Sequence, residues 1–410
     1  MADPAVSLLC LSVSHCPSPA TLERIGRLLA TRALNTDRFL QLAKFHGVVP
    51  LAARNLELAW RKRSDAGASE TTPQVEALLG HLQNTAREMA HENLRLTSAL
   101  LELLDRMEAV HVECIAYKGP VLARRLYGDT ALRTFDDLDL LVSPDDVDQA
   151  TTVLTEMGFH GWEIFTKGEM ERLGESRYAR HFGHTQRRLA VDLHWDLADP
   201  AWGFRTAELL ENAKPETTKI GGRAVRTLPT SLLLLALCVH GSKHEPLPWY
   251  QLKWAADVAR LMELVPDWEA TMEQARRFRV ERATLLGLLC AHELVGGPLA
   301  PPVRQALSNN PGIGEAWALI QPHLFRPPEN TSLDELSTRQ RLSLDLSLVD
   351  RRLDRLRFIV RRLLTPTPKD WEVVQLPSQL SAGYYLIRPF RLLASELLRV
   401  GRSGSSSGLR

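Results

Sequence analysis

The sequence of 410 residues has little of what marks a secreted, zinc-binding or membrane-spanning protein. None of its five cysteines forms a C-x-x-C pair, which argues against a disulfide framework and against structural zinc. The longest apolar run, residues 232–239, is far shorter than the roughly 18 residues that a membrane span needs. No basic segment precedes the apolar residues 8–13, so no signal peptide is expected. These absences predict a cytoplasmic protein with reduced thiols and no membrane partner.

An excess of charge of one sign is also missing. Fifty lysines and arginines stand against 49 aspartates and glutamates, a formal net charge of +1, so the chain as a whole gives no signal for an RNA or membrane partner. The stretch 351–362 is an exception, because it is basic and amphipathic. It suits either an RNA- or membrane-facing surface or a solvated helix face, and we favour the solvated face.

Helical periodicity fills both ends of the chain, and short strand-like runs fill its middle. Amphipathic patterns cover 19–60 and 74–109, with a polar loop over 62–73 between them. Strands are expected at 111–117, 135–142, 159–164 and 188–197. Helices are expected again at 230–244, 250–264, 267–279, 281–295, 334–365 and 376–400.

These patterns predict an α+β fold in which a small sheet lies between two helical regions. The predicted divisions are an N-terminal helical region 1–109, an α/β core 110–228, a C-terminal helical region 229–400 and a disordered Gly/Ser-rich tail 401–410.

The strand over 135–142 carries the most informative residues. Side chains two apart in a strand share a face, so Asp137 and Asp139 point the same way, while Leu138, Leu140 and Val142 point to the other side. Two neighbouring carboxylates repel each other unless a cation compensates them. Mg²⁺ prefers oxygen ligands, so this strand predicts a metal site.

A second strand, near residues 190–197, places Asp192, His194 and Asp196 on one face. If the two strands are neighbours, Asp192 joins Asp137 and Asp139. Three carboxylates fit a two-metal arrangement for phosphoryl transfer. The role of His194 stays open between orienting Asp192, contacting substrate and simple packing.

Lys118 and Gly119 lie where the first strand ends and a short helix begins. The glycine lets the backbone approach a phosphate, and a helix N-terminus supplies N–H donors. The ammonium of Lys118 is suited to neutralise a triphosphate, and Arg133, just before the acidic strand, is a second candidate.

His240, Lys243 and His244 share a face of a predicted helix. Lys243 is the best candidate there for a phosphate contact. The two histidines lack a third ligand for zinc, so their roles stay open.

The order of these motifs resembles the uncharacterised bacterial nucleotidyltransferase family of the DNA polymerase β-like nucleotidyltransferase superfamily. The motifs are Lys118-Gly119, Asp137-Leu-Asp139 and Asp192-Leu-His194-Trp195, and the resemblance extends to the flanks Lys44-Phe45-His46-Gly47 and Leu252-Lys253-Trp254. One departure is that superfamily members usually carry Gly-Ser where this chain has Lys118-Gly119.

The resemblance implies a polymerase β-like core with a small mixed sheet, a nucleoside triphosphate donor and two Mg²⁺ ions. By position, Asp137, Asp139 and Asp192 match the catalytic metal ligands. The expected reaction transfers a nucleoside monophosphate, by default from ATP, to an acceptor hydroxyl and releases pyrophosphate. The acceptor stays open between a small molecule, a protein and an RNA. The alternative is a non-catalytic nucleotide- or partner-binding module of the toxin–antitoxin kind.

Overall fold

The computed structural model describes residues 3–65, 73–161, 178–197, 214–243, 247–326, 336–364, 373–374, 376 and 383–392. Several predictions of the sequence analysis lie outside these ranges. They concern His244, the tail 401–410, the end of the strand 159–164, most of the loop 62–73 and most of the helix 376–400.

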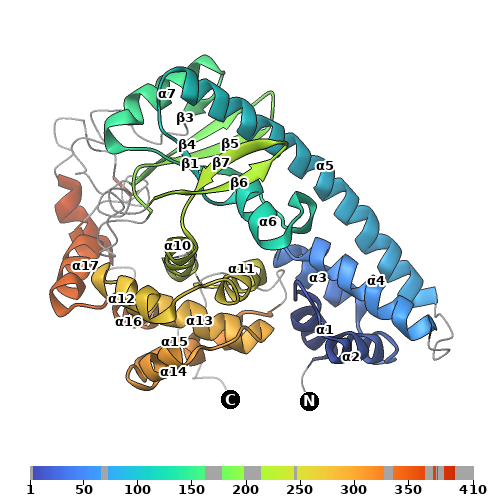
Figure 1. Ribbon diagram of the computed structural model, residues 1–410. Helices are drawn as coiled ribbons and strands as arrows, with labels where there is room; N and C mark the ends of the chain where they lie inside the picture. The colour runs from blue at the N-terminus through green and yellow to red at the C-terminus, as the bar shows by residue number, and fades with distance from the viewer. Residues whose placement is uncertain are drawn as a thin grey trace.

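The N-terminal region is helical, as predicted (Figure 1). The segment 19–60 forms three helices, and an additional helix precedes them because Asp3 caps its first turn by accepting from the Ala5 N–H. The bounds are α1 Pro4–Ser12, α2 Pro19–Leu29, α3 Thr36–Phe45 and α4 Val49–Asp65.

Helix α5, Pro73–Ala109, is continuous over the predicted 74–109 segment and links two hydrophobic cores. Its first half contributes Val75, Leu78 and Leu82 to a core shared by the N-terminal and C-terminal helices. Its second half contributes Leu100 and Met107 to the core beneath the sheet. Figure 1 shows it running from α4 to the sheet. One amphipathic helix therefore ties the sheet to the helical regions.

The sheet has five strands in the order β1-β2-β5-β4-β3, and a separate hairpin of β6 and β7 contacts β1. Among the described strands of this sheet, β2 and β5 pair in parallel and the other pairs are antiparallel. The bounds are β1 Ile115–Ala116, β2 Leu138–Leu141, β3 His160–Gly161, β4 Ala179–His184, β5 Leu189–His194, β6 Glu216–Ile220 and β7 Arg223–Thr227. This small mixed sheet with its flanking helices confirms the predicted α+β class.

Strand β4 and the β6–β7 hairpin were not predicted from the sequence. Strand β4 reads Ala-Arg-His-Phe-Gly-His, which has no clean apolar alternation because basic residues and a glycine interrupt it. The segment forms a strand because all six of its residues pair with β5, although its own sequence does not predict a strand.

The two faces of the central strands differ as the alternation predicted. Leu138, Leu140, Val191 and Leu193 are buried in the core that lies under α5 and α7. The helices that pack near the strands are α6 Gly119–Tyr127 and α7 Val147–Glu156, with short 3₁₀ turns at Thr130–Leu132 and Pro144–Asp146. The opposite face carries the acidic residues.

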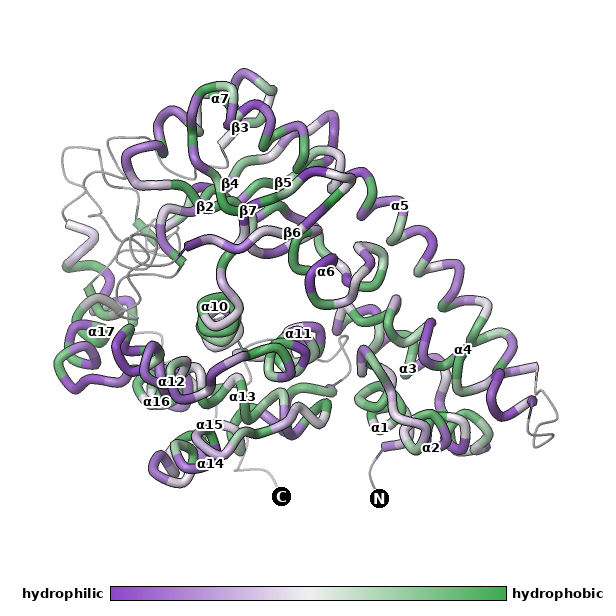
Figure 2. Tube along the Cα trace, in the orientation of Figure 1, coloured by the Kyte–Doolittle hydropathy of each residue, from purple (hydrophilic) through white to green (hydrophobic). Residues whose placement is uncertain are grey.

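The C-terminal region is a helical assembly around α10, Thr230–Lys243. Residues 232–239 of this helix are all buried, and Figure 2, which views the helix nearly end-on, shows it mostly in the green of hydrophobic residues. The long apolar run is therefore a central core helix. The other helices are α11 Leu252–Met262, α12 Trp268–Arg277, α13 Glu281–Val295, α14 Pro301–Ser308, α15 Gly312–Ile320, α16 Thr338–Leu348 and α17 Arg352–Leu364, with a 3₁₀ turn at Gln321–His323.

Four of these helices match predicted ones, α14 and α15 were not predicted, and the predicted helix 334–365 divides into α16 and α17. On α17, Leu353 and Leu356 are exposed beside the arginines of the basic stretch. Within the described ranges, every helix falls short of the length and apolar character that crossing a bilayer requires.

A buried ion pair joins the α/β core to the C-terminal helices. Arg133 donates from Nε to Asp257 of α11 at 2.9 Å, and the hydroxyl of Tyr127 donates to the same carboxylate at 2.8 Å. A second junction lies at Gly47, whose carbonyl accepts from Thr134, while the carbonyl of His46 accepts from the backbone of Lys253. These contacts fix the start of α11 beside the acidic strand.

Candidate active site

The parallel register of β2 and β5 creates the acidic cluster. Asp139 lies directly beside Asp192, and His194 follows two residues later on the same face. One ligand atom from each of these three side chains lies within 4.8 Å of the others. The strand pairing on which the sequence analysis depended is therefore present.

Asp137 precedes β2, whose first residue is Leu138. Its carboxylate is close enough to Asp139 and Asp192 to interact with both electrostatically. The neighbouring Asp136 is exposed, and Asp196 uses its carboxylate to accept from the Leu197 N–H. Asp139 and Asp192 therefore converge, whereas Asp137, the third predicted ligand, is outside this group of ligand atoms but near enough to be repelled by both.

Lys118 supplies a cation to this cluster. Its Nζ donates to Oδ1 of Asp139 at 2.6 Å, and both side chains are largely shielded from solvent. Gly119 begins α6 with a φ of 55°, and a Cβ there would lie 3.4 Å from the carbonyl oxygen of Asp137. A glycine is needed because this backbone conformation is costly for other residues. The helix N-terminus thereby approaches the acidic strand.

The pKa values of Asp137 and Asp139 are shifted in opposite directions. Repulsion from Asp139, together with burial, raises the pKa of Asp137 to about 6. Burial opposes ionisation of Asp139 too, but the Lys118 ammonium and the hydrogen bond from His194 outweigh it and hold the pKa of Asp139 below its usual range. The site therefore carries more negative charge than its own lysine compensates.

His194 is 4% exposed, and its Nε2 lies 3.2 Å from Oδ1 of Asp139. Burial lowers its pKa, so the ring is neutral at pH 7. Tyr117 packs against it edge-on and Tyr178 stacks on it. The hydroxyl of Tyr178 in turn accepts from Nζ of Lys243 at 3.0 Å. Lys243, a predicted phosphate contact, therefore approaches the cluster from α10.

Two further residues at the site were missed in the sequence analysis. His181 of β4 lies opposite Asp192, and its Nδ1 is 2.6 Å from Oδ1 of that carboxylate. Lys253 of α11 packs against Gly47, and its ammonium is attracted by Asp136, Asp257 and Asp137. Burial lowers the pKa of Lys253.

A sequence signal for Lys253 did exist. Lys253, Asp257 and Arg260 recur at i, i+4 and i+7, which makes one charged stripe on an otherwise apolar helix. For His181 no comparable signal exists, because its meeting with Asp192 depends on a strand pairing.

Arg133 and His240 are not part of the cluster. The guanidinium of Arg133 is directed to Asp257, as described above. The ring of His240 packs edge-on against Trp254. The structure thus brings Lys118, Gly119 and Lys243 towards the carboxylates, and it places Arg133 in the interface behind them.

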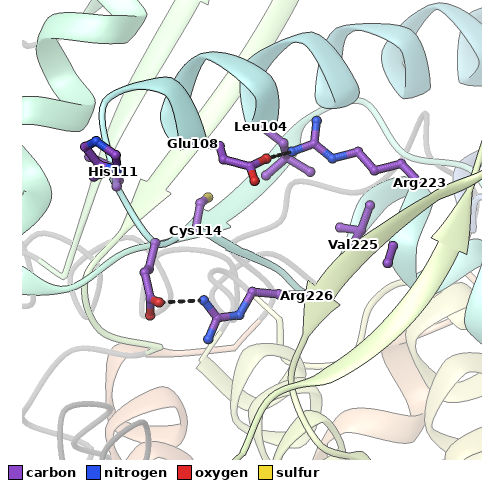
Figure 3. A pocket seen from close by; sticks show the side chains of 10 residues that line it. Leu104, Glu108, His111, Cys114, Arg223, Val225 and Arg226 are labelled. Carbon is purple, nitrogen blue, oxygen red and sulfur yellow. Dashed lines mark hydrogen bonds and ion pairs between the residues drawn. The ribbon is translucent and has the colours of Figure 1, made fainter.

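A separate pocket of about 410 Å³ lies between the end of α5 and β7 (Figure 3). Its charged residues are paired within it, because Arg223 binds Glu108 and Arg226 binds Glu113. It contains none of the clustered carboxylates.

The donor set of the acidic cluster fits a divalent cation. Carboxylate oxygens from Asp139 and Asp192 converge with an imidazole nitrogen, and a lysine ammonium already lies against one of the oxygens. A cation is what the excess negative charge requires.

Residues 32–296, more than half of the chain, match a family model described as "Uncharacterised nucleotidyltransferase". The chain belongs to this nucleotidyltransferase family. The family and the enzyme class predicted from the motif order are thereby confirmed. Comparison of this nucleotidyltransferase with curated protein sequences finds no match.

Solved nucleotidyltransferase structures are similar over about half of the enzyme. A crystal structure of ANT(2″)-Ia with adenylyl-2″-tobramycin is 18% identical, over 45% of this chain and 96% of that chain, with a TM-score of 0.34. A solution structure of the antibiotic-resistance factor ANT(2″)-Ia is 16% identical, over 46% and 94%, with a TM-score of 0.34. An antigenic nucleotidyltransferase-like protein from Paracoccidioides brasiliensis is 16% identical, over 52% and 92%, with a TM-score of 0.34.

Replacing Asp137 should stabilise the metal-free enzyme. Because the pKa of Asp137 is higher in the folded protein than in the unfolded chain, its ionised form destabilises the fold above about pH 6. We expect Asp137→Asn to stabilise the fold at pH 8 by on the order of 1 kcal/mol, and the gain to disappear below about pH 3, where the carboxyl is protonated in both states. Thermal unfolding with a chelator present measures both values.

Asp136→Asn is the matched control, since Asp136 is adjacent but exposed. If the wild type is as stable as Asp137→Asn at pH 8, the carboxylate of Asp137 is not repelled by its neighbours as described.

Proposed function

We propose that the enzyme transfers a nucleoside monophosphate from a nucleoside triphosphate to an acceptor hydroxyl, with release of pyrophosphate and with dependence on Mg²⁺ or a similar divalent ion. The observation that carries this proposal is the register of β2 and β5, which sets Asp192 beside Asp139. ATP is the default donor.

Asp137, Asp139 and Asp192 are the proposed metal ligands, with two ions as the expected number. When bound, the ions supply Lewis-acid stabilisation of the charge that develops on the attacking and leaving oxygens. Asp192 also helps to remove the proton of the acceptor hydroxyl, and His181, hydrogen-bonded to it, holds its carboxylate in place.

Positive charge around the cluster is suited to the triphosphate. We assign phosphate binding to Lys118, to the backbone N–H groups at Gly119 and to Lys243. Lys118 pairs with Asp139 in the structure, and we propose that it shifts to the phosphates when the metal neutralises that carboxylate. Arg133 holds α11 in place through Asp257 instead of binding phosphate.

Lys253 is an additional phosphate-binding candidate. No carboxylate of the described residues lies within ion-pairing distance of its ammonium, although the side chain is largely buried. Burying a lysine without a partner costs stability, so a use for its charge is expected. The pyrophosphate portion of a nucleotide whose α-phosphate lies at the carboxylates would supply that partner.

Asp139→Asn should reduce transfer by at least about 10³-fold, because a neutral amide cannot hold the metal charge. The assay follows label from each α-³²P-NTP into small-molecule, protein and RNA fractions of a cell extract, together with pyrophosphate release. Asp196→Asn is the matched control and should keep activity within about threefold, since Asp196 is outside the cluster. Transfer that survives Asp139→Asn in a folded protein would refute this carboxylate as a ligand of the catalytic metal. Absence of transfer by the wild type from every NTP would favour the binding module instead.

Lys253→Met should lower kcat/KM for the NTP by about tenfold or more, because it removes a cation from the phosphate site. Stability should not fall, since a buried charge is removed with it. Lys219→Met, on the exposed strand β6, serves as the control. If the two variants have equal kcat/KM values, Lys253 does not contact the nucleotide.

A further inference from the structure

His194 is directed at the carboxylates by the strand that carries Asp192. It is the only non-carboxylate member of the group of convergent ligand atoms found among the described residues. Its Nε2 and the Nζ of Lys118 approach the same oxygen of Asp139, at 3.2 Å and 2.6 Å. The imidazole therefore contacts the same carboxylate oxygen that already binds the ammonium of Lys118.

Among the described residues, the hydrogen bond of the His194 ring is made to the cluster. Nδ1 is buried and has no hydrogen-bond partner in the described part of the chain, while Nε2 faces Asp139. A hydrogen bond at Nδ1 therefore does not orient the ring. The packing of Tyr117 and Tyr178 fixes the plane of the ring instead. This leaves a rigidly held imidazole that has one polar neighbour.

The spacing of Nε2 and Oδ1 fits two ligands of one ion. Ligands that bind a divalent ion at about 2.1 Å lie about 3.0–3.4 Å apart at octahedral or tetrahedral angles. The observed separation of 3.2 Å falls in this interval. A small ion can therefore bind both atoms with little movement of either strand, once the ring proton that Nε2 donates to Asp139 has moved to Nδ1.

We propose that His194 is a nitrogen ligand of the divalent-metal site, so that the enzyme binds first-row transition ions such as Co²⁺ and Mn²⁺ in preference to Mg²⁺. The proposal rests on the metal site of the proposed function and adds a metal preference to it. Imidazole is a good ligand for transition ions, whereas Mg²⁺ takes oxygen ligands. Mg²⁺ can still support the reaction through the carboxylates.

The test measures metal binding directly. Calorimetric titrations with Co²⁺ and with Mg²⁺ compare the wild type with His194→Asn, whose shorter polar side chain leaves no donor atom at the position of Nε2. We expect the wild type to bind Co²⁺ at least about tenfold more tightly than Mg²⁺. His194→Asn should lose about tenfold or more in Co²⁺ affinity and less than threefold in Mg²⁺ affinity. His184→Asn, on the neighbouring strand and outside the cluster, should change neither.

Pulsed EPR of the Mn²⁺-loaded wild type provides a readout that needs no variant. We expect ¹⁴N coupling from a bound imidazole. Mn²⁺ bound at Asp139 without nitrogen coupling would overturn this proposal, leave His194 as a hydrogen-bond donor and leave the proposed function intact. If Asp139→Asn binds Co²⁺ as tightly as the wild type does, and Mg²⁺ as tightly as the wild type does, the metal site itself is refuted, and the proposed function with it.

Discussion

The repulsion between carboxylates at the start of β2 and the middle of β5 is the constraint on which the site depends. Asp139 and Asp192 are direct neighbours in a parallel pair, and Asp137 is near both. Lys118 compensates Asp139, and the remaining repulsion raises the pKa of Asp137 to about 6. A fold selected only for stability would not retain three such side chains, so their cost is evidence of use.

The surrounding architecture keeps these charges together. One face of the strands is anchored by the apolar core under α5 and α7. On the other side, the buried pair of Arg133 and Asp257 fixes α11 against the α/β core. This pairing is expensive to bury, and breaking it would leave an uncompensated charge. Lys253 lies in the first turn of the same helix, so the ion pair that joins the two regions also sets the position of a cation near Asp137.

The sequence predicts the parts of this enzyme that depend on local periodicity. The alternation of Leu138, Asp139 and Leu140 gives the two faces of β2, and α5 and α10 follow from their apolar spacing. The motif order gives the family. The features that the sequence does not predict depend on contacts between residues that are distant along the chain. Strand β4 lacks an apolar alternation of its own, so the meeting of His181 with Asp192 was invisible. Arg133 has the same local context whether it faces a phosphate or Asp257.

The central claim is that this cluster binds a nucleoside triphosphate through a divalent ion. Isothermal titration with each NTP, with and without Mg²⁺ or Mn²⁺, tests it most directly, and the double variant Asp137→Ala/Asp139→Ala is the control. The account predicts binding of at least one NTP that requires the metal ion and disappears in the folded variant. Binding that is equally tight without metal, or that survives in the variant, would contradict it.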